Sequence, residues 1–199
     1  MIPVGIFAKP PRAGTVKTRL IPDIGAAKAA RVYRYCVEHT LDVARLSGLD
    51  YQIFLSEECD DQIFLEEQYA MQRGPDLGTR MKNALKDLLA GNPEGALIIG
   101  TDCLDISARH SRQAAQALAN HELVLLPAVD GGYALIGSTE ANPALFRSVS
   151  WSSTKVMKQT LSNAAKLNYR VSLLDTVRDI DTLQDLEHYP ELLALVASS

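Results

Sequence analysis

Positively charged side chains gather in one loop near the start of the chain, between Ala8 and Leu20. These side chains are Lys9, Arg12, Lys17 and Arg19, in a chain whose net charge is -4. Lysine and arginine bind phosphate through charge and several N–H donors, and a ligand can approach the backbone closely at Gly14. The spacing therefore indicates a phosphate-binding loop, and an ordinary solvated loop with scattered charges is an equal alternative.

This loop matches neither of the two common phosphate motifs. The Walker A pattern requires glycine directly before Lys-Ser/Thr, whereas Val16 precedes Lys17-Thr18. The dinucleotide pattern Gly-x-Gly-x-x-Gly is also missing from this turn. We therefore expect side chains to make most of the phosphate contacts, with Lys17 and Arg19 as exposed cations.

Asp102 follows closely, after Gly100 and Thr101, on a continuous apolar run, Ala96-Leu97-Ile98-Ile99, that is typical of a strand buried on both faces. A carboxylate at that point can bind a divalent metal that bridges phosphate oxygens. An aspartate there can equally cap a helix or stabilise a turn, and Asp105 close behind makes capping realistic. The residues alone leave both interpretations open.

Three other places carry side chains of interest. Asp130-Gly131-Gly132-Tyr133 has the composition of a tight turn, and its glycine pair would also admit a sugar or an acceptor close to the backbone. We expect one of Asp179 and Asp181 to cap the final helix and the other to complete a metal site. Trp151, the one tryptophan, is expected to pack rather than to stack on a ligand. The four histidines form no ligand pattern.

Strands and helices must alternate along the chain to position these residues. Apolar runs predict strands at 4–7, 51–55, 69–72, 96–99, 123–128, 133–137 and 170–174. Helical spacing predicts helices near 25–46, 77–89, 107–119, 154–167 and 182–196, with a short surface helix within 57–67. Ser152 or Ser153 is the expected N-cap of the fourth long helix. The pattern predicts a single three-layer α/β domain, residues 1–199, with a mostly parallel sheet and ligands beyond the carboxyl ends of its strands.

Composition narrows the class of protein. The chain has 199 residues, 47% hydrophobic and 22% charged, which is ordinary for one globular domain. The acidic balance argues against general nucleic-acid binding, and no apolar run is long enough to span a membrane. Cys36, Cys59 and Cys103 include no Cys-x-x-Cys pair, and the first residues lack the pattern of a signal peptide. We expect a cytoplasmic protein with small-molecule substrates.

Six motifs follow one another along nearly the whole chain. They are Phe7-Ala8-Lys9-Pro10-Pro11 with Gly14 and Lys17-Thr18-Arg19-Leu20, then Gln72-Arg73-Gly74-Pro75-Asp76-Leu77-Gly78-Thr79-Arg80-Met81, Gly100-Thr101-Asp102-Cys103, Asp130-Gly131-Gly132-Tyr133, Trp151-Ser152-Ser153 and Asp179-Ile180-Asp181-Thr182. Together they resemble an uncharacterised family of bacterial and archaeal transferases with the nucleotide-diphospho-sugar transferase (GT-A-like, Rossmann-like) fold. Some members of that family are described as glycosyltransferases encoded near radical-SAM genes or linked to arsenosugar synthesis.

The resemblance implies a metal-dependent transferase with a nucleotide-activated sugar donor, an unknown acceptor, and Mg²⁺ or Mn²⁺. It implies that donor phosphates face Lys17 and Arg19, that Asp102 takes the metal position of the fold, and that the nucleotide lies near the Leu77-Gly78 loop and Arg80. The full assignment is Lys17, Arg19 and Asp130 for catalysis, Lys9, Gly14, Lys17, Arg19, Leu77, Gly78 and Arg80 for the nucleotide and its phosphates, and Asp102 and Asp181 for the metal. One alternative is a nucleotidyltransferase that releases pyrophosphate from a nucleoside triphosphate. Another is a non-catalytic nucleotide-binding protein.

Overall fold

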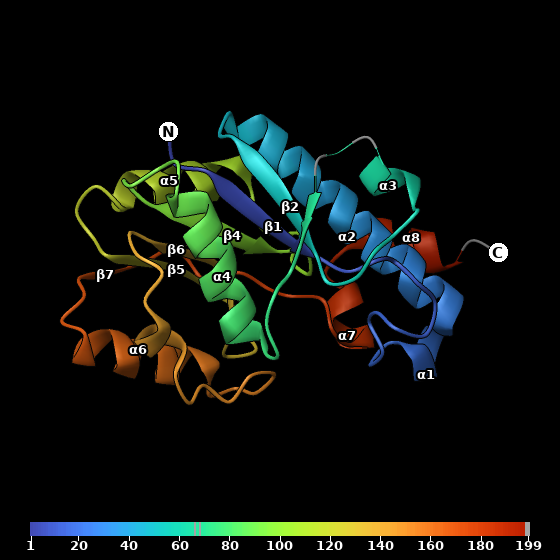
Figure 1. The fold of residues 1–199 in the computed structure, drawn as a ribbon. Coiled ribbons are helices and arrows are strands. Elements are labelled where there is room, and N and C mark those ends of the chain that lie inside the picture. Colours follow the sequence, from blue (N-terminus) through green and yellow to red (C-terminus); the bar gives the residue numbers. More distant parts are fainter. Residues whose placement is uncertain (66, 68, 198–199) are drawn as a thin grey trace.

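Strand β1 (Val4–Ala8) is buried at every position and is an inner strand of a seven-stranded sheet in the computed structural model. The structure describes residues 1–65, 67 and 69–197. The other strands are β2 (Tyr51–Leu55), β3 (Tyr69–Met71), β4 (Ala96–Gly100), β5 (Leu123–Pro127), β6 (Tyr133–Ser138) and β7 (Val171–Leu173). Their order across the sheet is β3-β2-β1-β4-β6-β5-β7. Only β6 runs antiparallel to its neighbours, β4 and β5, among the described residues. The predicted seven-stranded, mostly parallel α/β domain is confirmed (Figure 1).

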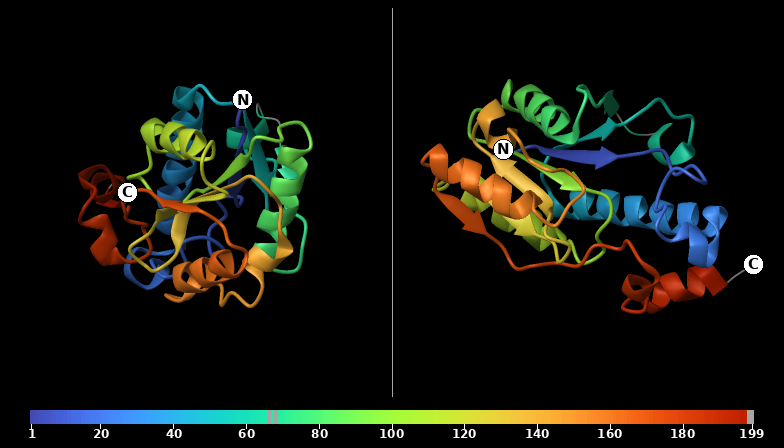
Figure 2. Two further views of the ribbon diagram at one scale, coloured as in Figure 1. Left: turned by 90° about the vertical axis from the view of Figure 1, so that its left-hand side faces the viewer. Right: turned by 90° about the horizontal axis from the view of Figure 1, so that it is seen from below.

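Helices cover both faces of this sheet (Figure 2, left). The α-helices are α1 (Ile21–Ile24), α2 (Ala26–Ser47), α3 (Gln62–Leu65), α4 (Leu77–Leu89), α5 (Ala108–Ala117), α6 (Val156–Lys166), α7 (Leu183–Leu186) and α8 (Pro190–Ala197), and a 3-10 helix spans Pro143–Phe146. Helices α2 and α5 pack on one face, where Ile6 belongs to the core. Helices α4 and α6 pack on the other, where Phe7 belongs to the core. Successive residues of β1 thus serve opposite layers, as the alternation of side chains along a strand requires.

A third, smaller core joins the start of the chain to its C-terminal helices. Leu20 and Ile180 are both fully buried in it, together with residues of α2, α7 and α8. The ribbon views place α7 and α8 beside α1 and the first turns of α2 (Figures 1 and 2). This core therefore fixes the segment around Ile180 against the basic loop that ends at Leu20.

The prediction of one long final helix was wrong. The chain forms α7 and then α8, with Pro190 as the first residue of α8, where a missing N–H costs nothing. The expectation that Asp179 or Asp181 caps this region was also wrong, because Thr182 is the N-cap and Asp185 completes a capping box with it.

The start of α6 also differs from the prediction. Lys155 occupies the N-cap position without a capping side chain, and the helix begins at Val156. Ser152 adopts a left-handed backbone conformation, with φ at 59°. The Ser153 hydroxyl donates to the Ser150 carbonyl and accepts weakly from the Lys155 N–H, so it stabilises a turn before the helix. Of the predicted surface helix within 57–67, only α3 forms among the described residues, and Glu66 lies outside them.

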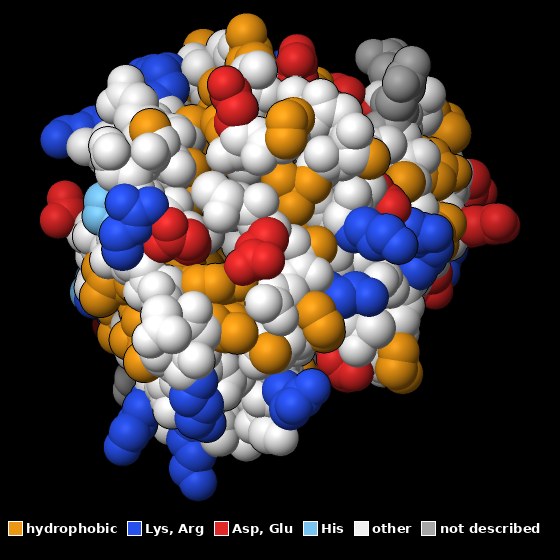
Figure 3. Space-filling model, turned by 60° about the vertical axis from the view of Figure 1, so that its left-hand side comes forward, with side chains coloured by type: hydrophobic (Ala, Val, Ile, Leu, Met, Phe, Trp, Pro, Cys, Tyr) orange, Lys and Arg blue, Asp and Glu red, His pale blue; other side chains and the backbone are white. Residues whose placement is uncertain are grey.

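The surface mixes side chains of opposite charge. On the face in Figure 3, basic, acidic and hydrophobic side chains are interspersed. Within the described part of the chain, no helix combines the length and the apolar character that crossing a bilayer requires.

Candidate functional site

The basic loop leaves the carboxyl end of β1 and is anchored at both of its ends. At the first end, the Lys9 N–H donates to the Tyr33 hydroxyl at 2.8 Å, while the Lys9 side chain is exposed. At the other end, Leu20 is fully buried. Between these anchors Gly14 is exposed, with a left-handed φ of 87°. Arg12 is engaged by the segment after β2, since it pairs with Glu57 at 3.1 Å.

Lys17 is a buried cation, which corrects the expectation that it is exposed. Its side chain is 4% exposed, and its Nζ lies 3.5 Å from Oδ1 of Asp181. Its backbone is left-handed, with φ at 46°, a conformation that costs free energy for a residue with a side chain. Burial alone would lower the pKa of Lys17, but Asp102, Cys36, Asp181 and Asp179 raise it above the ordinary value. The ammonium group therefore stays charged at neutral pH.

Arg19 contacts the same carboxylate from the solvent side. Its Nη1 donates to Oδ2 of Asp181 at 2.9 Å, and its side chain is 63% exposed. Arg19 and Asp181 are 162 residues apart in sequence. The buried side chains of Leu20 and Ile180, next to each of them in sequence, belong to one core cluster and hold the two segments together. Asp181 therefore neutralises both cations that we had assigned to donor phosphates.

Asp102 offers a carboxylate without a hydrogen-bonding partner among the described residues. It is exposed, directly after Gly100 and Thr101 at the end of β4, and its backbone carbonyl accepts from the Ile180 N–H at 2.9 Å. The capping alternative is excluded, because Ser107 is the N-cap of α5. The carboxylate of Asp102 is also the strongest of the charges that raise the pKa of Lys17, so the two groups lie near each other.

Asp130 and Asp179 extend the acidic side of this region. Asp130 closes its turn by accepting from the Gly132 N–H at 2.7 Å. Gly131 is required there, because its φ is 88° and an added Cβ would lie 2.5 Å from the Thr154 carbonyl oxygen. Burial, and next the charge of Asp130, raises the pKa of Asp179 to about 6. Asp130 and Asp179 are therefore electrostatic neighbours.

The N-terminus of α4 carries the residues that the resemblance placed near the nucleotide. Leu77 is exposed, Gly78 is buried, and Arg80 donates to the Gly74 carbonyl at 3.0 Å. An added Cβ at Gly78 would lie 2.6 Å from the ring of Trp151. Trp151 is half-buried and also packs near Phe146, with ring centroids 6.4 Å apart, as the packing interpretation expected.

The candidate residues thus fall into two groups at the carboxyl edge of the sheet. Lys17, Arg19, Asp102 and Asp181 are linked by ion pairs or by charge, and Asp130 joins them through Asp179. Leu77, Gly78 and Arg80 form a second group at the start of α4, and no described contact joins it to the first.

Sequence reasoning missed the contacts of Tyr33, whose hydroxyl accepts from the Lys9 N–H and lies 2.8 Å from Oγ1 of Thr101. Tyr33 follows the apolar spacing of a helix, and this spacing indicates core packing rather than a polar contact. The phenol hydroxyl of Tyr33, at an apolar position of this helix, could have indicated a polar contact, because a buried hydroxyl needs a hydrogen-bonding partner.

The donor set fits a metal that arrives with phosphate better than a metal held by protein alone. No group of three or more His, Cys, Asp or Glu side chains in the described chain is arranged to hold a metal ion. The carboxylate of Asp102 has no hydrogen-bonding partner within residues 1–65, 67 and 69–197, whereas both oxygens of Asp181 face cations. Mg²⁺ is commonly bound by one or two carboxylates, water and substrate phosphates, and this arrangement suits that mode.

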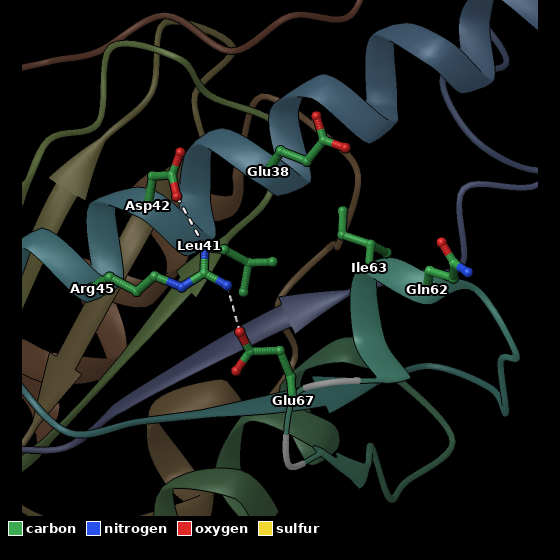
Figure 4. A pocket seen from close by; sticks show the side chains of 7 residues that line it. All are labelled: Glu38, Leu41, Asp42, Arg45, Gln62, Ile63 and Glu67. Atoms are coloured by element: carbon green, nitrogen blue, oxygen red, sulfur yellow. Dashed lines mark hydrogen bonds and ion pairs between the residues drawn. The ribbon is translucent and has the colours of Figure 1, made fainter.

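A separate cavity of about 340 Å³ lies against α2 and α3 (Figure 4). Arg45 pairs with Asp42 on the same helix at 2.9 Å and crosses the cavity to pair with Glu67 at 2.5 Å. The residues that line it are Glu38, Leu41, Asp42, Arg45, Gln62, Ile63 and Glu67. None of them belongs to the candidate site, so this cavity is a different part of the surface.

Residues 40–153 match a family described as "Uncharacterized protein conserved in bacteria (DUF2064)". The chain belongs to this DUF2064 family. The match contains the motifs at Asp102, Asp130 and Trp151, and it does not extend to the basic loop or to Asp181. No curated protein matches the sequence.

Solved structures confirm the fold, and one of them confirms the resemblance over nearly the whole chain. A protein of Desulfovibrio desulfuricans G20, provisionally named a nucleotide-diphospho-sugar transferase, has 26% identity and a TM-score of 0.88, over 99% of this chain and 98% of that one. Rv0371c of Mycobacterium tuberculosis H37Rv, solved with manganese, has 16% identity and a TM-score of 0.54 over 100% of both chains. The 4-diphosphocytidyl-2C-methyl-D-erythritol synthase of Anaerococcus prevotii DSM 20548 has 12% identity and a TM-score of 0.59, over 98% of this chain and 95% of that one.

Proposed function

We propose that this DUF2064 protein is a transferase that takes a nucleotide-activated sugar as donor, together with Mg²⁺ or Mn²⁺. One observation carries the proposal: Lys17 and Arg19 converge on the carboxylate of Asp181 at the carboxyl edge of the sheet. Two cations that meet at one anionic group suit a diphosphate, because a diphosphate presents several negatively charged oxygens close together. The name given to the Desulfovibrio desulfuricans protein supports the same class of donor.

In this proposal the two cations have different tasks. Lys17 is fixed by burial and stays charged, so it supplies a preorganised positive charge to the leaving diphosphate. Arg19 is exposed and can turn from Asp181 to a phosphate oxygen. Lys9 and Gly14 are exposed on the same loop, and in this proposal they would line the approach to the phosphates.

The carboxylates complete the assignment. Asp102 and Asp181 would hold the metal, whose chemistry is to neutralise the phosphate oxygens and the charge that develops on the leaving group. Asp130, whose charge acts on Asp179, would accept a proton from the acceptor. Leu77, Gly78 and Arg80, at the start of α4, would contact the nucleotide.

The second candidate function is nucleotidyl transfer, which the likeness in fold to the Anaerococcus prevotii synthase favours. In that reaction the same cations would surround the β- and γ-phosphates of a nucleoside triphosphate. Attack at the α-phosphorus would then release pyrophosphate. The two reactions need similar cations and differ in the bond that breaks.

The deciding experiment supplies Mg²⁺ or Mn²⁺ with either nucleotide-sugars or nucleoside triphosphates, and a cell extract as the source of acceptors. Nucleoside diphosphate released from a nucleotide-sugar by the wild type, and lost in Asp102→Asn, is the expected result. Asp50→Asn is the matched control, since Asp50 is an exposed carboxylate just before β2, at the opposite edge of the sheet. Release of pyrophosphate from a triphosphate without nucleotide-sugar turnover would favour the second candidate.

A further inference from the structure

A chain of three hydrogen bonds lies directly beneath the candidate site. The Lys9 N–H contacts the hydroxyl of Tyr33 at 2.8 Å, and that hydroxyl lies 2.8 Å from Oγ1 of Thr101. Oγ1 of Thr101 in turn donates to the Phe7 carbonyl at 3.1 Å. The chain thus runs from the end of β1 to α2, on to the end of β4, and back to β1.

The direction of every bond in this chain is fixed. A backbone N–H can only donate, so Tyr33 accepts from Lys9. The single proton of the Thr101 hydroxyl goes to the carbonyl of Phe7, so Thr101 must accept from Tyr33. Burial raises the pKa of Tyr33, so its phenol keeps the proton that this arrangement requires. Replacing the hydroxyl therefore leaves the Lys9 N–H without its acceptor and Thr101 without its donor.

The two residues joined by Tyr33 each begin a candidate ligand-binding segment. Lys9 is the first residue of the basic loop, and Thr101 directly precedes Asp102. Tyr33 comes from α2, which contributes no residue to the proposed set, and its side chain is buried beneath the two segments. The hydroxyl of Tyr33 thus serves as a common attachment point for the segment that carries cations and the segment that carries the free carboxylate.

We propose that Tyr33 is a positioning residue that fixes the basic loop and Asp102 relative to each other. The inference rests on the proposed function, because it assumes that phosphate and metal meet between these two segments. Tyr33 touches neither ligand and acts through Lys9 and Thr101. Its removal should therefore weaken the binding of diphosphate and metal together.

Calorimetric titration with inorganic pyrophosphate and Mn²⁺ tests this without knowledge of the nucleotide. Tyr33→Phe should weaken binding about 3- to 10-fold, the factor that one ordinary hydrogen bond contributes. Tyr51→Phe is the matched control, because it removes a tyrosine hydroxyl that contacts Glu67, beside the separate cavity. It should bind pyrophosphate like the wild type. Thr101→Val interrupts the same chain with little change of volume and should reproduce the loss if Tyr33→Phe fails to fold.

A double-mutant cycle distinguishes positioning from general loosening. Because Tyr33 acts by fixing Asp102 relative to the basic loop, Tyr33→Phe should cost little further affinity once Asp102→Asn has removed the carboxylate charge. An equal loss in both backgrounds would overturn the proposal. So would wild-type affinity in Tyr33→Phe itself.

Amide hydrogen exchange separates this proposal from the proposed function. Tyr33→Phe should accelerate exchange at the Lys9 amide and shift the resonances of Asp102, and Tyr51→Phe should do neither. If the wild type binds no pyrophosphate with Mn²⁺, the proposed function fails, and these spectra alone decide the role of Tyr33. Unchanged exchange at Lys9 and unchanged Asp102 resonances would refute the positioning role.

Discussion

Lys17 and Arg19 look equivalent in sequence but occupy opposite environments. Lys17 has a left-handed backbone and a buried side chain, whereas Arg19 is exposed. Both still face Asp181. Replacing Lys17 therefore disturbs the folded protein as well as the charge, while replacing Arg19 changes mainly the charge.

Lys17→Ala and Arg19→Ala should both weaken the binding of pyrophosphate with Mn²⁺ about ten- to a hundredfold, the value of one charge-assisted contact. Lys17→Ala should also lower the free energy of unfolding by about 1–3 kcal/mol, because the ion pair of a buried lysine with a partly buried carboxylate is broken. Arg19→Ala should lower it by less than about 1 kcal/mol, as expected for an exposed pair. Calorimetry and urea denaturation measure the two effects.

Lys86→Ala is the control for these variants, since it removes an exposed cation near the end of α4. It should leave both affinity and stability unchanged. If Lys17→Ala and Arg19→Ala both bind pyrophosphate as tightly as the wild type, the proposal that this loop binds phosphate is wrong.

Asp181 competes with phosphate for the same two cations, so its removal should strengthen metal-free binding of phosphate and reduce the additional affinity that metal gives. Asp181→Asn frees Lys17 and Arg19, so pyrophosphate should bind more tightly than to the wild type when a chelator removes all metal. With Mn²⁺ present, the gain in affinity that metal gives should become smaller. Asp102→Asn should reduce the metal effect without improving metal-free binding. Weaker metal-free binding in Asp181→Asn would contradict this role.

At the scale of elements, the strands could be predicted from the sequence because each is an apolar run bounded by polar residues or glycine. The ends of helices were harder to predict, because a cap depends on which side chain reaches a backbone N–H. Thr182 rather than Asp181 caps α7, since Asp185 lies where it can complete the capping box. Sequence placed Lys17 correctly in the loop after β1, but its burial depends on segments far away in the chain, which no local pattern reveals.

The contact between α4 and the segment around Trp151 depends on a glycine. An added Cβ at Gly78 would meet the Trp151 ring at 2.6 Å and Cβ of Phe146 at 3.0 Å. Gly78→Ala should therefore lower the free energy of unfolding by about 1–3 kcal/mol through overpacking. Trp151 is the one tryptophan, so its fluorescence should report the displacement directly.

The matched substitution is Gly91→Ala, where an added Cβ meets nothing within 4 Å. It should leave the Trp151 emission and the unfolding midpoint close to those of the wild type. If Gly78→Ala also leaves both unchanged, the packing of the Trp151 ring does not require glycine at position 78.

Across the whole molecule, the three cysteines differ in burial, and so we expect their thiols to differ in reactivity toward alkylating reagents. Burial raises the pKa of both Cys36 and Cys103 to about 12, and Cys59 is only half-buried. Because the thiolate is the nucleophile, Cys36 and Cys103 should resist iodoacetamide at pH 8, and Cys59 should be alkylated first. Peptide mass spectrometry measures the order, and all three should react in denaturant. Labelling of Cys36 as fast as Cys59 in the folded protein would show that α2 opens.

The ion pair between Arg19 and Asp181 also has a consequence for the order in which this protein is made. The two residues are separated by 162 positions. At 5–20 residues per second, the ribosome needs roughly 8 to 30 seconds to add the carboxylate after the arginine. Throughout that interval the basic loop of the nascent chain has no counter-charge from Asp181. A cellular polyphosphate or nucleotide can therefore meet these cations before the protein's own carboxylate does.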